Sequence, residues 1–266
     1  MRDYFLESRG IAYRTNTFVA GRQTLIFIHR LSGNVRVWEP YEAALEHFYN
    51  ILTYDLRGHG LSARPKTFDE YALPFFTEDL RALISHLHIE LPIIISHSFG
   101  TLIAQQFLLA YPNTVSKSLF ISPVYNIHKI FLTRLTFIGL SLYVCLLRLF
   151  TAKPFEQRRH GYVFNAQAGD WDIRRVSEDI RVTGFRSYSY CLRHLYGADT
   201  DVHWKLSTTP SYILHGQHDT LVPVTNAKAL AKVLPKVTLE IIDDNHCIVL
   251  NNVQKVLRTI ERLAVQ

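Results

Sequence analysis

Ser98 lies at a point where a predicted strand turns directly into a predicted helix. The strand is the short apolar run 91–95, and residues 96–100, Ser-His-Ser-Phe-Gly, separate it from an apolar pattern of helical spacing. Such a tight turn holds a serine in a strained backbone conformation and points its hydroxyl out of the sheet edge. The strand and the helix nearly touch there, and the small residues Ser96 and Gly100 suit that approach. The pattern favours a nucleophilic serine over an ordinary surface loop.

A serine hydroxyl is a weak nucleophile at neutral pH, so Ser98 needs a base and a carboxylate that orients the base. His246 follows the last predicted strand and is the candidate base. Asp219 follows the preceding strand and is the candidate carboxylate. Asp243 and Asp244 are rival acids by composition, but they stand too close to His246 in the sequence to be its usual partner. These residue types together indicate nucleophilic catalysis by a serine.

Alternating strands and helices must position these side chains. The predicted strands are 4–8, 11–15, 24–28, 50–54, 91–95, 115–122, 211–215 and 237–242. The predicted helices are 37–48, 75–87, 225–234, 247–263 and one that follows Ser98. Regular alternation indicates an α/β fold, with a mostly parallel sheet and helices on both of its faces. The first two strands are typical of a hairpin at a sheet edge.

Residues 124–204 interrupt this alternation. They are rich in aromatic residues, and their pattern is helical with no clear strand. We therefore predict a core made of residues 1–123 and 205–266, with 124–204 inserted as a helical cap over the carboxyl edge of the sheet. Open α/β sheets bind their ligands at that edge.

The ordered motifs resemble those of the α/β-hydrolase superfamily, in particular esterases and lipases that carry a cap. The resemblance rests on 96–100, where a serine replaces the usual first glycine, on 55–62 (Asp-Leu-Arg-Gly-His-Gly-Leu-Ser), and on the order Ser98, Asp219, His246. It covers almost the full length. It implies that Ser98 is the nucleophile, that His246 is general base and then acid, and that Asp219 orients the histidine. It implies no cofactor, and the sequence has no metal-ligand spacing and no glycine-rich phosphate loop.

The same resemblance predicts an oxyanion hole made of two backbone N–H groups. One belongs to Phe99, directly after the nucleophile, and the other to Leu31, two residues after His29. The family usually has glycine after that histidine, whereas this chain has Arg30, which lacks the backbone freedom of glycine. Arg30 either points into solvent or presents a cation to an acidic group of the substrate.

Segment 130–150 is apolar nearly all round. The uncharged part between Arg134 and Arg148 is shorter than the roughly 20 apolar residues that a bilayer crossing takes. The favoured interpretation is a buried cap helix that lines an acyl pocket. Two alternatives stay open, namely a peripheral contact with the membrane interface and a homodimer contact.

An apolar cap over a reactive serine suggests a substrate with an apolar acyl or alcohol part. Phe99, Phe164, Trp171 and Tyr188 are the candidate pocket residues in addition to Arg30. The charged residues between 170 and 186 are typical of a solvated helix face.

Composition limits the partners. The chain has 266 residues, 48% hydrophobic and 20% charged, which is typical of a folded globular protein. Its formal net charge of +6 comes without a long Lys/Arg run or a nucleic-acid motif, so no nucleic acid is expected as a partner. The three cysteines give no disulfide framework or zinc site. Together with residues 1–15, which lack the apolar core of a secretory signal, they favour a cytoplasmic protein, with a membrane-peripheral one as the alternative.

The sequence therefore favours a serine hydrolase that cleaves a carboxylic ester of an apolar small molecule or lipid through an acyl-enzyme. Thioester, lactone, amide and carbon–carbon bonds are alternatives that the same residues serve. An epoxide hydrolase or a haloalkane dehalogenase is disfavoured, because its nucleophile would be an aspartate in place of Ser98. The competing class is a binding or receptor protein with little activity, since a fold alone does not establish catalysis.

Overall fold

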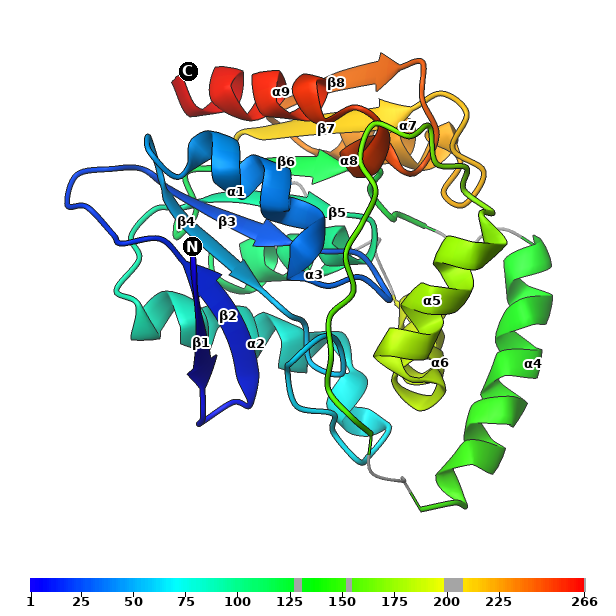
Figure 1. Cartoon of the computed structure of the whole chain (residues 1–266). Coiled ribbons are helices and arrows are strands. Elements are labelled where there is room, and N and C mark those ends of the chain that lie inside the picture. Colours follow the sequence, from blue (N-terminus) through cyan, green and yellow to red (C-terminus); the bar gives the residue numbers. More distant parts are fainter. Residues whose placement is uncertain (127–130, 152–154, 199–207, 266) are drawn as a thin grey trace.

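Eight strands of the described residues form one sheet, in the order β1-β2-β4-β3-β5-β6-β7-β8 (Figure 1). The computed structural model describes residues 1–126, 131–151, 155–198 and 208–265, with side chains in the second range from residue 136 onward. The strands are β1 (Arg2–Leu6), β2 (Ile11–Thr15), β3 (Thr24–Ile28), β4 (Asn50–Tyr54), β5 (Ile93–His97), β6 (Lys117–Ile121), β7 (Ser211–Gly216) and β8 (Val237–Ile242). β2 pairs antiparallel with both β1 and β4, and all other neighbours are parallel. The predicted α/β fold with a mostly parallel sheet and an edge hairpin is confirmed.

Helices cover both faces of this sheet. They are α1 (Glu39–Leu45), α2 (Leu73–His86), α3 (Phe99–Ala110), α4 (Phe131–Arg148), α5 (Ile173–Thr183), α6 (Phe185–Gly197), α7 (Val224–Val233), α8 (Ile248–Asn251) and α9 (Val253–Val265), with 3₁₀ turns η1 (Val35–Trp38) and η2 (Asp69–Tyr71). Successive side chains of β3 point alternately into two core clusters, one on each face of the sheet. Leu25 and Phe27 pack with α1, α8 and α9, whereas Ile26 and Ile28 pack with α2, α3 and α7. A strand that is buried on both faces has a mostly apolar sequence, and β3 is visible in the sequence for this reason.

Element boundaries differ from the predictions where a special residue intervenes. The predicted helix 37–48 begins instead as η1, and α1 follows with Pro40 in its first turn, a position that proline favours. The predicted helix 247–263 is divided into α8 and α9 at Asn252, whose φ of −131° and ψ of 54° leave the helical region. β5 begins at Ile93, after Leu91 with a positive φ of 42°, and continues through His97.

Helices α4, α5 and α6 lie beyond the carboxyl ends of the parallel strands, with α4 outermost (Figure 1). The expectation of a helical pattern throughout 124–204 was wrong for residues 155–172, which contain no helix or strand. This stretch follows the protein surface and bonds to α8, through the hydrogen bonds from Asn165 N–H to Leu250 O and from Ala168 N–H to Asn251 Oδ1, both of 2.7 Å. The boundary at 204/205 lies outside the described residues, so the division into core and cap stays a prediction. We call 124–204 the cap segment below.

Candidate active site

Ser98 occupies a strained turn between β5 and α3. Its φ is 52° and its ψ is −118°, a conformation that L-residues rarely adopt. The Ser98 amide donates to Ile121 O at 3.0 Å, which fixes the turn against β6. A Cβ on Gly100 would lie 2.7 Å from the carbonyl oxygens of Ile28 and His29, so only glycine lets α3 approach β3 this closely. The backbone therefore holds the serine hydroxyl at the carboxyl end of the sheet.

His246 joins Ser98 to Asp219 through hydrogen bonds. Its Nε2 lies 2.8 Å from Ser98 Oγ, and its Nδ1 lies 2.7 Å from Asp219 Oδ2. The other carboxylate oxygen, Oδ1, accepts the amides of Leu221 at 3.0 Å and Val222 at 2.7 Å. An acid oriented in this way keeps the proton of His246 on Nδ1, so that Nε2 is the acceptor that faces the serine hydroxyl. The structure thus brings together the three residues that the sequence singled out.

Asp170, in the cap segment, holds the two loops that carry the histidine and the acid. Its Oδ1 accepts the His246 amide at 2.8 Å, and its Oδ2 accepts both the amide and the hydroxyl of Thr220, at 2.8 and 2.7 Å. The expectation that Asp170 belongs to a solvated charged face was wrong, because its side chain is buried between these loops. No sequence signal distinguishes it from a surface carboxylate, since its partners lie 50 and 76 residues away.

Leu31 lines the same cavity as Ser98 and His246. Its amide has no hydrogen-bond acceptor among the residues that the structure describes. Phe99 is the first residue of α3, where helix amides have no intrahelical acceptor. These two amides stay our candidates for an oxyanion hole. The Phe99 side chain is not a pocket residue, because it is fully buried against the Phe76 ring, with the ring centroids 5.4 Å apart.

A cavity of about 200 Å³ lies beside Ser98, between the sheet edge and helices α5 and α6. Arg30, Trp171 and Tyr188, three of the candidate pocket residues, line this cavity, and the Trp171 side chain is exposed. Phe164 does not reach the cavity, because it packs against the core cluster on the α1 and α9 side of the sheet. The apolar part of the wall is formed by Leu31, Val124, Val176, Leu192, Leu195, Tyr196, Leu221 and Val222.

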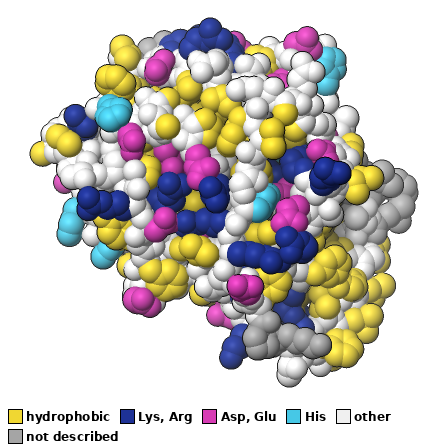
Figure 2. All heavy atoms as spheres, viewed as in Figure 1, with side chains coloured by type: hydrophobic (Ala, Val, Ile, Leu, Met, Phe, Trp, Pro, Cys, Tyr) yellow, Lys and Arg dark blue, Asp and Glu magenta, His cyan; other side chains and the backbone are white. Residues whose placement is uncertain are grey.

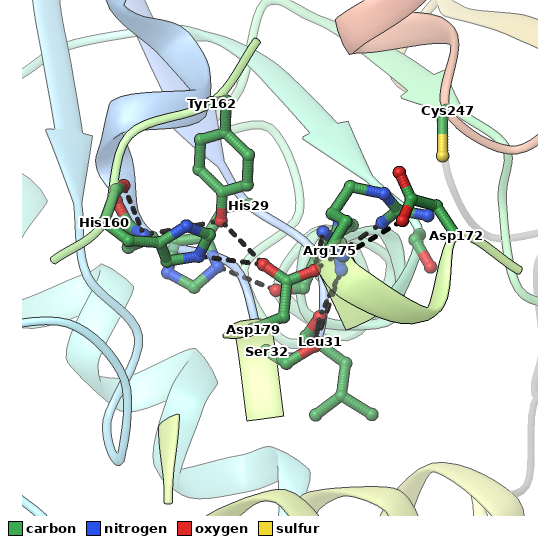
Figure 3. A network of polar contacts seen from close by, with 12 residues as sticks. His29, Leu31, Ser32, His160, Tyr162, Asp172, Arg175, Asp179 and Cys247 are labelled. Atoms are coloured by element: carbon green, nitrogen blue, oxygen red, sulfur yellow. Dashed lines mark hydrogen bonds and ion pairs between the residues drawn. The ribbon is translucent and has the colours of Figure 1, made fainter. Parts of the chain in front are cut away.

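Arg30 is bound to the cap segment by the buried carboxylate of Asp179. Figure 3 shows this carboxylate among His160, Tyr162 and Arg175. Asp179 is fully buried, and besides the ion pair with Arg30 it has His160 Nε2 at 2.8 Å, Tyr162 OH at 3.4 Å and Arg175 Nη1 at 3.5 Å. Burial raises the pKa of this carboxyl, but Arg30 and His160 more than offset that and lower the pKa below its usual value. Arg30 therefore does not point into solvent, and that alternative was wrong.

Asp179 was also predicted to lie on a solvated face, and the spacing within α5 contains the signal against this. Val182 and Thr183 are buried and follow Asp179 by three and four residues, so all three share the inner face of the helix. A carboxylate on an inner helix face needs a cationic partner, because an unpaired buried charge is costly. Arg30 is that partner, and the pair joins the predicted oxyanion loop to the cap segment.

Comparison with known proteins identifies this architecture. Residues 23–253 match a protein-family model described as alpha/beta hydrolase fold. The chain belongs to the α/β-hydrolase family. The protein ABHD8 of Bos taurus is 25% identical to this α/β-hydrolase over 240 residues, which is 85% of this chain and 52% of that protein. Human ABHD8 is 24% identical, with 85% and 51% covered. The chain thus spans about half the length of these curated relatives.

Solved structures of α/β-hydrolases superpose over nearly the whole chain. A putative lipase from Acinetobacter baumannii AYE has a TM-score of 0.77 at 20% identity, with 99% of this chain and 91% of that one covered. A hydrolase from Oleispira antarctica has a TM-score of 0.76 at 17% identity, with 96% and 94% covered. An esterase from Exiguobacterium antarcticum has a TM-score of 0.73 at 16% identity, with 96% of both chains covered. Identities this low establish the fold alone.

Two buried histidines, His29 and His59, support the predicted oxyanion loop of this α/β-hydrolase. Each ring accepts a hydrogen bond from one backbone amide and donates one to a backbone carbonyl. The partners are Leu56 N at 3.0 Å and Arg30 O at 2.8 Å for His29, and Ser32 N at 3.1 Å and Arg57 O at 3.0 Å for His59. Only a neutral ring can do both, and burial lowers the pKa of each histidine to about 3.

We expect the α/β-hydrolase to lose stability as the pH falls below about 6.5, the ordinary histidine pKa. Between that value and the folded-state pKa of about 3, the unfolded chain binds protons that neutral His29 and His59 do not bind. The free energy of unfolding should then fall by up to about 1.4 kcal/mol per pH unit for each histidine. Urea unfolding midpoints at several pH values measure this slope.

Substitution of one ring tests the assignment. His59→Gln should make the slope shallower, because glutamine keeps a donor and an acceptor but does not titrate. His47→Gln is the matched control, because His47 is exposed and should leave the slope unchanged. A slope that His59→Gln does not alter would contradict the neutral-ring account.

Proposed function

We propose that this chain is a serine hydrolase that cleaves a carboxylic ester of an apolar small molecule or lipid. The observation that carries the proposal is the hydrogen-bonded series Ser98–His246–Asp219, whose serine opens onto the cavity. A nucleophile, a base within 2.8 Å and a carboxylate that orients the base are the groups that acyl transfer requires. Several superposed structures carry the names esterase or lipase, which agrees with the proposal.

The proposed reaction has two halves. In the first, Ser98 Oγ attacks the ester carbonyl carbon while its proton passes to His246 Nε2, and that proton then goes to the leaving alcohol as the carbon–oxygen bond breaks. In the second, water gives a proton to His246 and attacks the acyl-enzyme, and the proton returns to Ser98 as the carboxylic acid leaves. The Leu31 and Phe99 amides are the proposed donors to the oxyanion formed in each half.

The cavity indicates the size of the group bound beside the serine. A volume of about 200 Å³ with mostly apolar walls accommodates a short acyl chain or a single ring. We therefore expect short-chain esters to be better substrates than long-chain ones. Cleavage of thioester, lactone, amide and carbon–carbon bonds requires the same catalytic groups, so only activity assays distinguish these substrates from simple esters.

One relative that matches part of this chain has a name that implies a different nucleophile. Epoxide hydrolase 1 of Caenorhabditis elegans is 34% identical over 96 residues, which is 35% of this chain and 23% of that protein. This chain has Ser98 where a hydrolase of that type would carry an aspartate. We therefore keep the ester hydrolase as our proposal.

Labelling with a fluorophosphonate tests the proposal, because this reagent forms a stable bond with an activated serine. The adduct, located by mass spectrometry, is expected on Ser98. Nitrophenyl butanoate, hexanoate and dodecanoate, assayed in parallel, should show turnover that falls at the longest chain. A folded protein that is neither labelled nor active would favour the competing proposal of a binding protein.

We expect Asp170→Asn to lower kcat with little change in KM. The amide group would place N–H donors against either the His246 amide or the Thr220 amide, so one of the two loops loses its acceptor. A misplacement of about 1 Å in the reacting groups costs up to about 10²-fold in rate. Steady-state kinetics on the butanoate ester measure the effect.

Asp172→Asn is the matched control for this substitution. Asp172 caps α5 by accepting the Arg175 amide at 3.1 Å, and asparagine caps a helix about as well as aspartate. Its kinetics should equal those of the wild type. Equal kcat values for the Asp170 and Asp172 variants would show that Asp170 does not position the catalytic loops.

A further inference from the structure

Helix α4 presents an apolar stripe to solvent. The stripe consists of Ile138, Leu142 and Leu146 in α4 and of Leu149 and Phe150 directly after the helix, with exposed fractions between 57% and 77%. The first three are spaced four residues apart, so they lie on one face of the helix. Hydrophobic side chains gather at the lower right of the molecule in Figure 2, where Figure 1 has α4. An exposed apolar patch of this kind marks an interaction surface.

The opposite face of α4 is fixed to α6, so the stripe cannot turn inward without breaking that packing. Val144 is buried, and Arg193 Nε donates to Ser141 Oγ at 2.7 Å. The Arg193 guanidinium also stacks 3.8 Å from the centre of the Phe137 ring. The helix is thus apolar on both sides but covered on only one, whereas such helices are normally buried all round.

The carboxyl-terminal end of α4 adds positive charge to this surface. A hollow of about 760 Å³ there is lined by Arg64, Lys66 and Arg186, and a neighbouring one of about 550 Å³ by Lys66, Arg148 and Arg186. None of these four cations forms an ion pair with a residue that the structure describes. Asp69 also lines the second hollow. We call the four cations the basic end.

We propose that the apolar stripe and the basic end form a docking surface for an anionic lipid bilayer. No described helix has the length and apolarity that crossing a bilayer needs, so α4 would lie in the plane of the interface. Anionic headgroups would complement the basic end while the stripe enters the acyl boundary. The proposal rests on this surface and does not depend on hydrolytic activity.

A second copy of the chain fits this surface less well than a bilayer does. A two-fold contact brings the same patch of both copies together, so the basic ends would meet a surface of the same sign. Among the described residues, Asp69 is the one acid that lines either hollow, and residues 136–150 contain no Asp or Glu, so the four cations exceed the acids of this surface. Charge complementarity thus selects the bilayer as the occupant.

Co-sedimentation with vesicles tests the proposal. We use phosphatidylcholine vesicles with and without phosphatidylglycerol, and the full chain as wild type and as Ser98→Ala. Binding should be about tenfold or more stronger with phosphatidylglycerol, should fall as salt is added, and should be equal for the two proteins. A folded wild type that stays in the supernatant with anionic vesicles at low salt would overturn the proposal.

Variants of the apolar stripe and of the basic end test whether vesicles bind at this surface. The double variant Leu142→Ser/Leu146→Ser should lower binding by about tenfold or more, and Lys66→Gln/Arg148→Gln should reduce the preference for phosphatidylglycerol. Phe48→Ser is the matched control, because Phe48 is 69% exposed and follows α1, which lies on another side of the molecule from α4 in Figure 1. Unchanged binding of the leucine variant would overturn the proposal. So would sedimentation velocity that shows a dimer lost in that variant, with no vesicle binding by the wild type.

Discussion

Replacing Ser98 by alanine should abolish ester turnover and leave the protein folded. The substitution removes the atom that attacks the acyl carbon, and loss of the nucleophile from such a triad lowers kcat on the order of 10⁶-fold. The residual rate should come from substrate binding and the oxyanion amides alone. Alanine also lacks the hydroxyl that the fluorophosphonate modifies, so labelling should disappear together with turnover.

Ser96→Ala separates this effect from damage to the turn. Ser96 is buried in β5 two residues earlier, and its hydroxyl makes one 3.3 Å hydrogen bond, to Leu119 O. The control variant should keep turnover within a few-fold of the wild type, and both variants should unfold at similar temperatures. Substantial turnover or labelling by Ser98→Ala would transfer the nucleophilic role to another residue.

Asp219→Asn should lower kcat on the order of 10⁴-fold through the wrong tautomer of His246. In the wild type, Asp219 Oδ1 accepts hydrogen bonds from the backbone amides of Leu221 and Val222. In the variant, the side-chain oxygen of the asparagine must take the place of Oδ1, because the NH₂ group cannot accept these bonds. The NH₂ group then faces His246 Nδ1, which has to accept a hydrogen bond. The histidine proton moves to Nε2, the atom that should accept the proton of Ser98.

Asp243→Asn is the matched control among the nearby acids. The Asp243 side chain is 91% exposed and pairs with His218 at the surface, so this variant should keep the wild-type rate. An Asp219→Asn variant with normal kcat, or an Asp243→Asn variant with a collapsed one, would show that the acid is misassigned.

The sheet could be predicted from the sequence, because a strand that is buried on both faces has a mostly apolar sequence. In Thr24–Ile28 every residue after the threonine is apolar, and the alternation of such strands with helices predicts a mostly parallel sheet. The turn around Ser98 was also visible, because the approach of helix to strand restricts the local residue types. Boundaries were less certain at Asn252, where a helix pattern continues through a non-helical residue.

The charged contacts of the cap segment could not be predicted in this way. Asp170 and Asp179 resemble surface carboxylates in sequence, but each is buried by a partner from a distant part of the chain. The pair of Asp179 with Arg30 spans 149 residues. The spacing of Asp179 with Val182 and Thr183 indicates an inner helix face, but it does not identify Arg30 as the partner, and Asp170 has no such spacing. The three-dimensional arrangement was therefore needed to find both contacts.

Asp170 has a consequence for how such a hydrolase can be remodelled. Because its carboxylate holds the amides of His246 and Thr220, the cap segment supplies part of the framework of the reactive centre. The segment is therefore not an interchangeable module that only selects what enters. A chimera that takes its cap from another family member should keep its reactivity only if the graft brings an acceptor to the place of Asp170. New specificity by segment exchange thus depends on preserving one carboxylate that holds two loops in place.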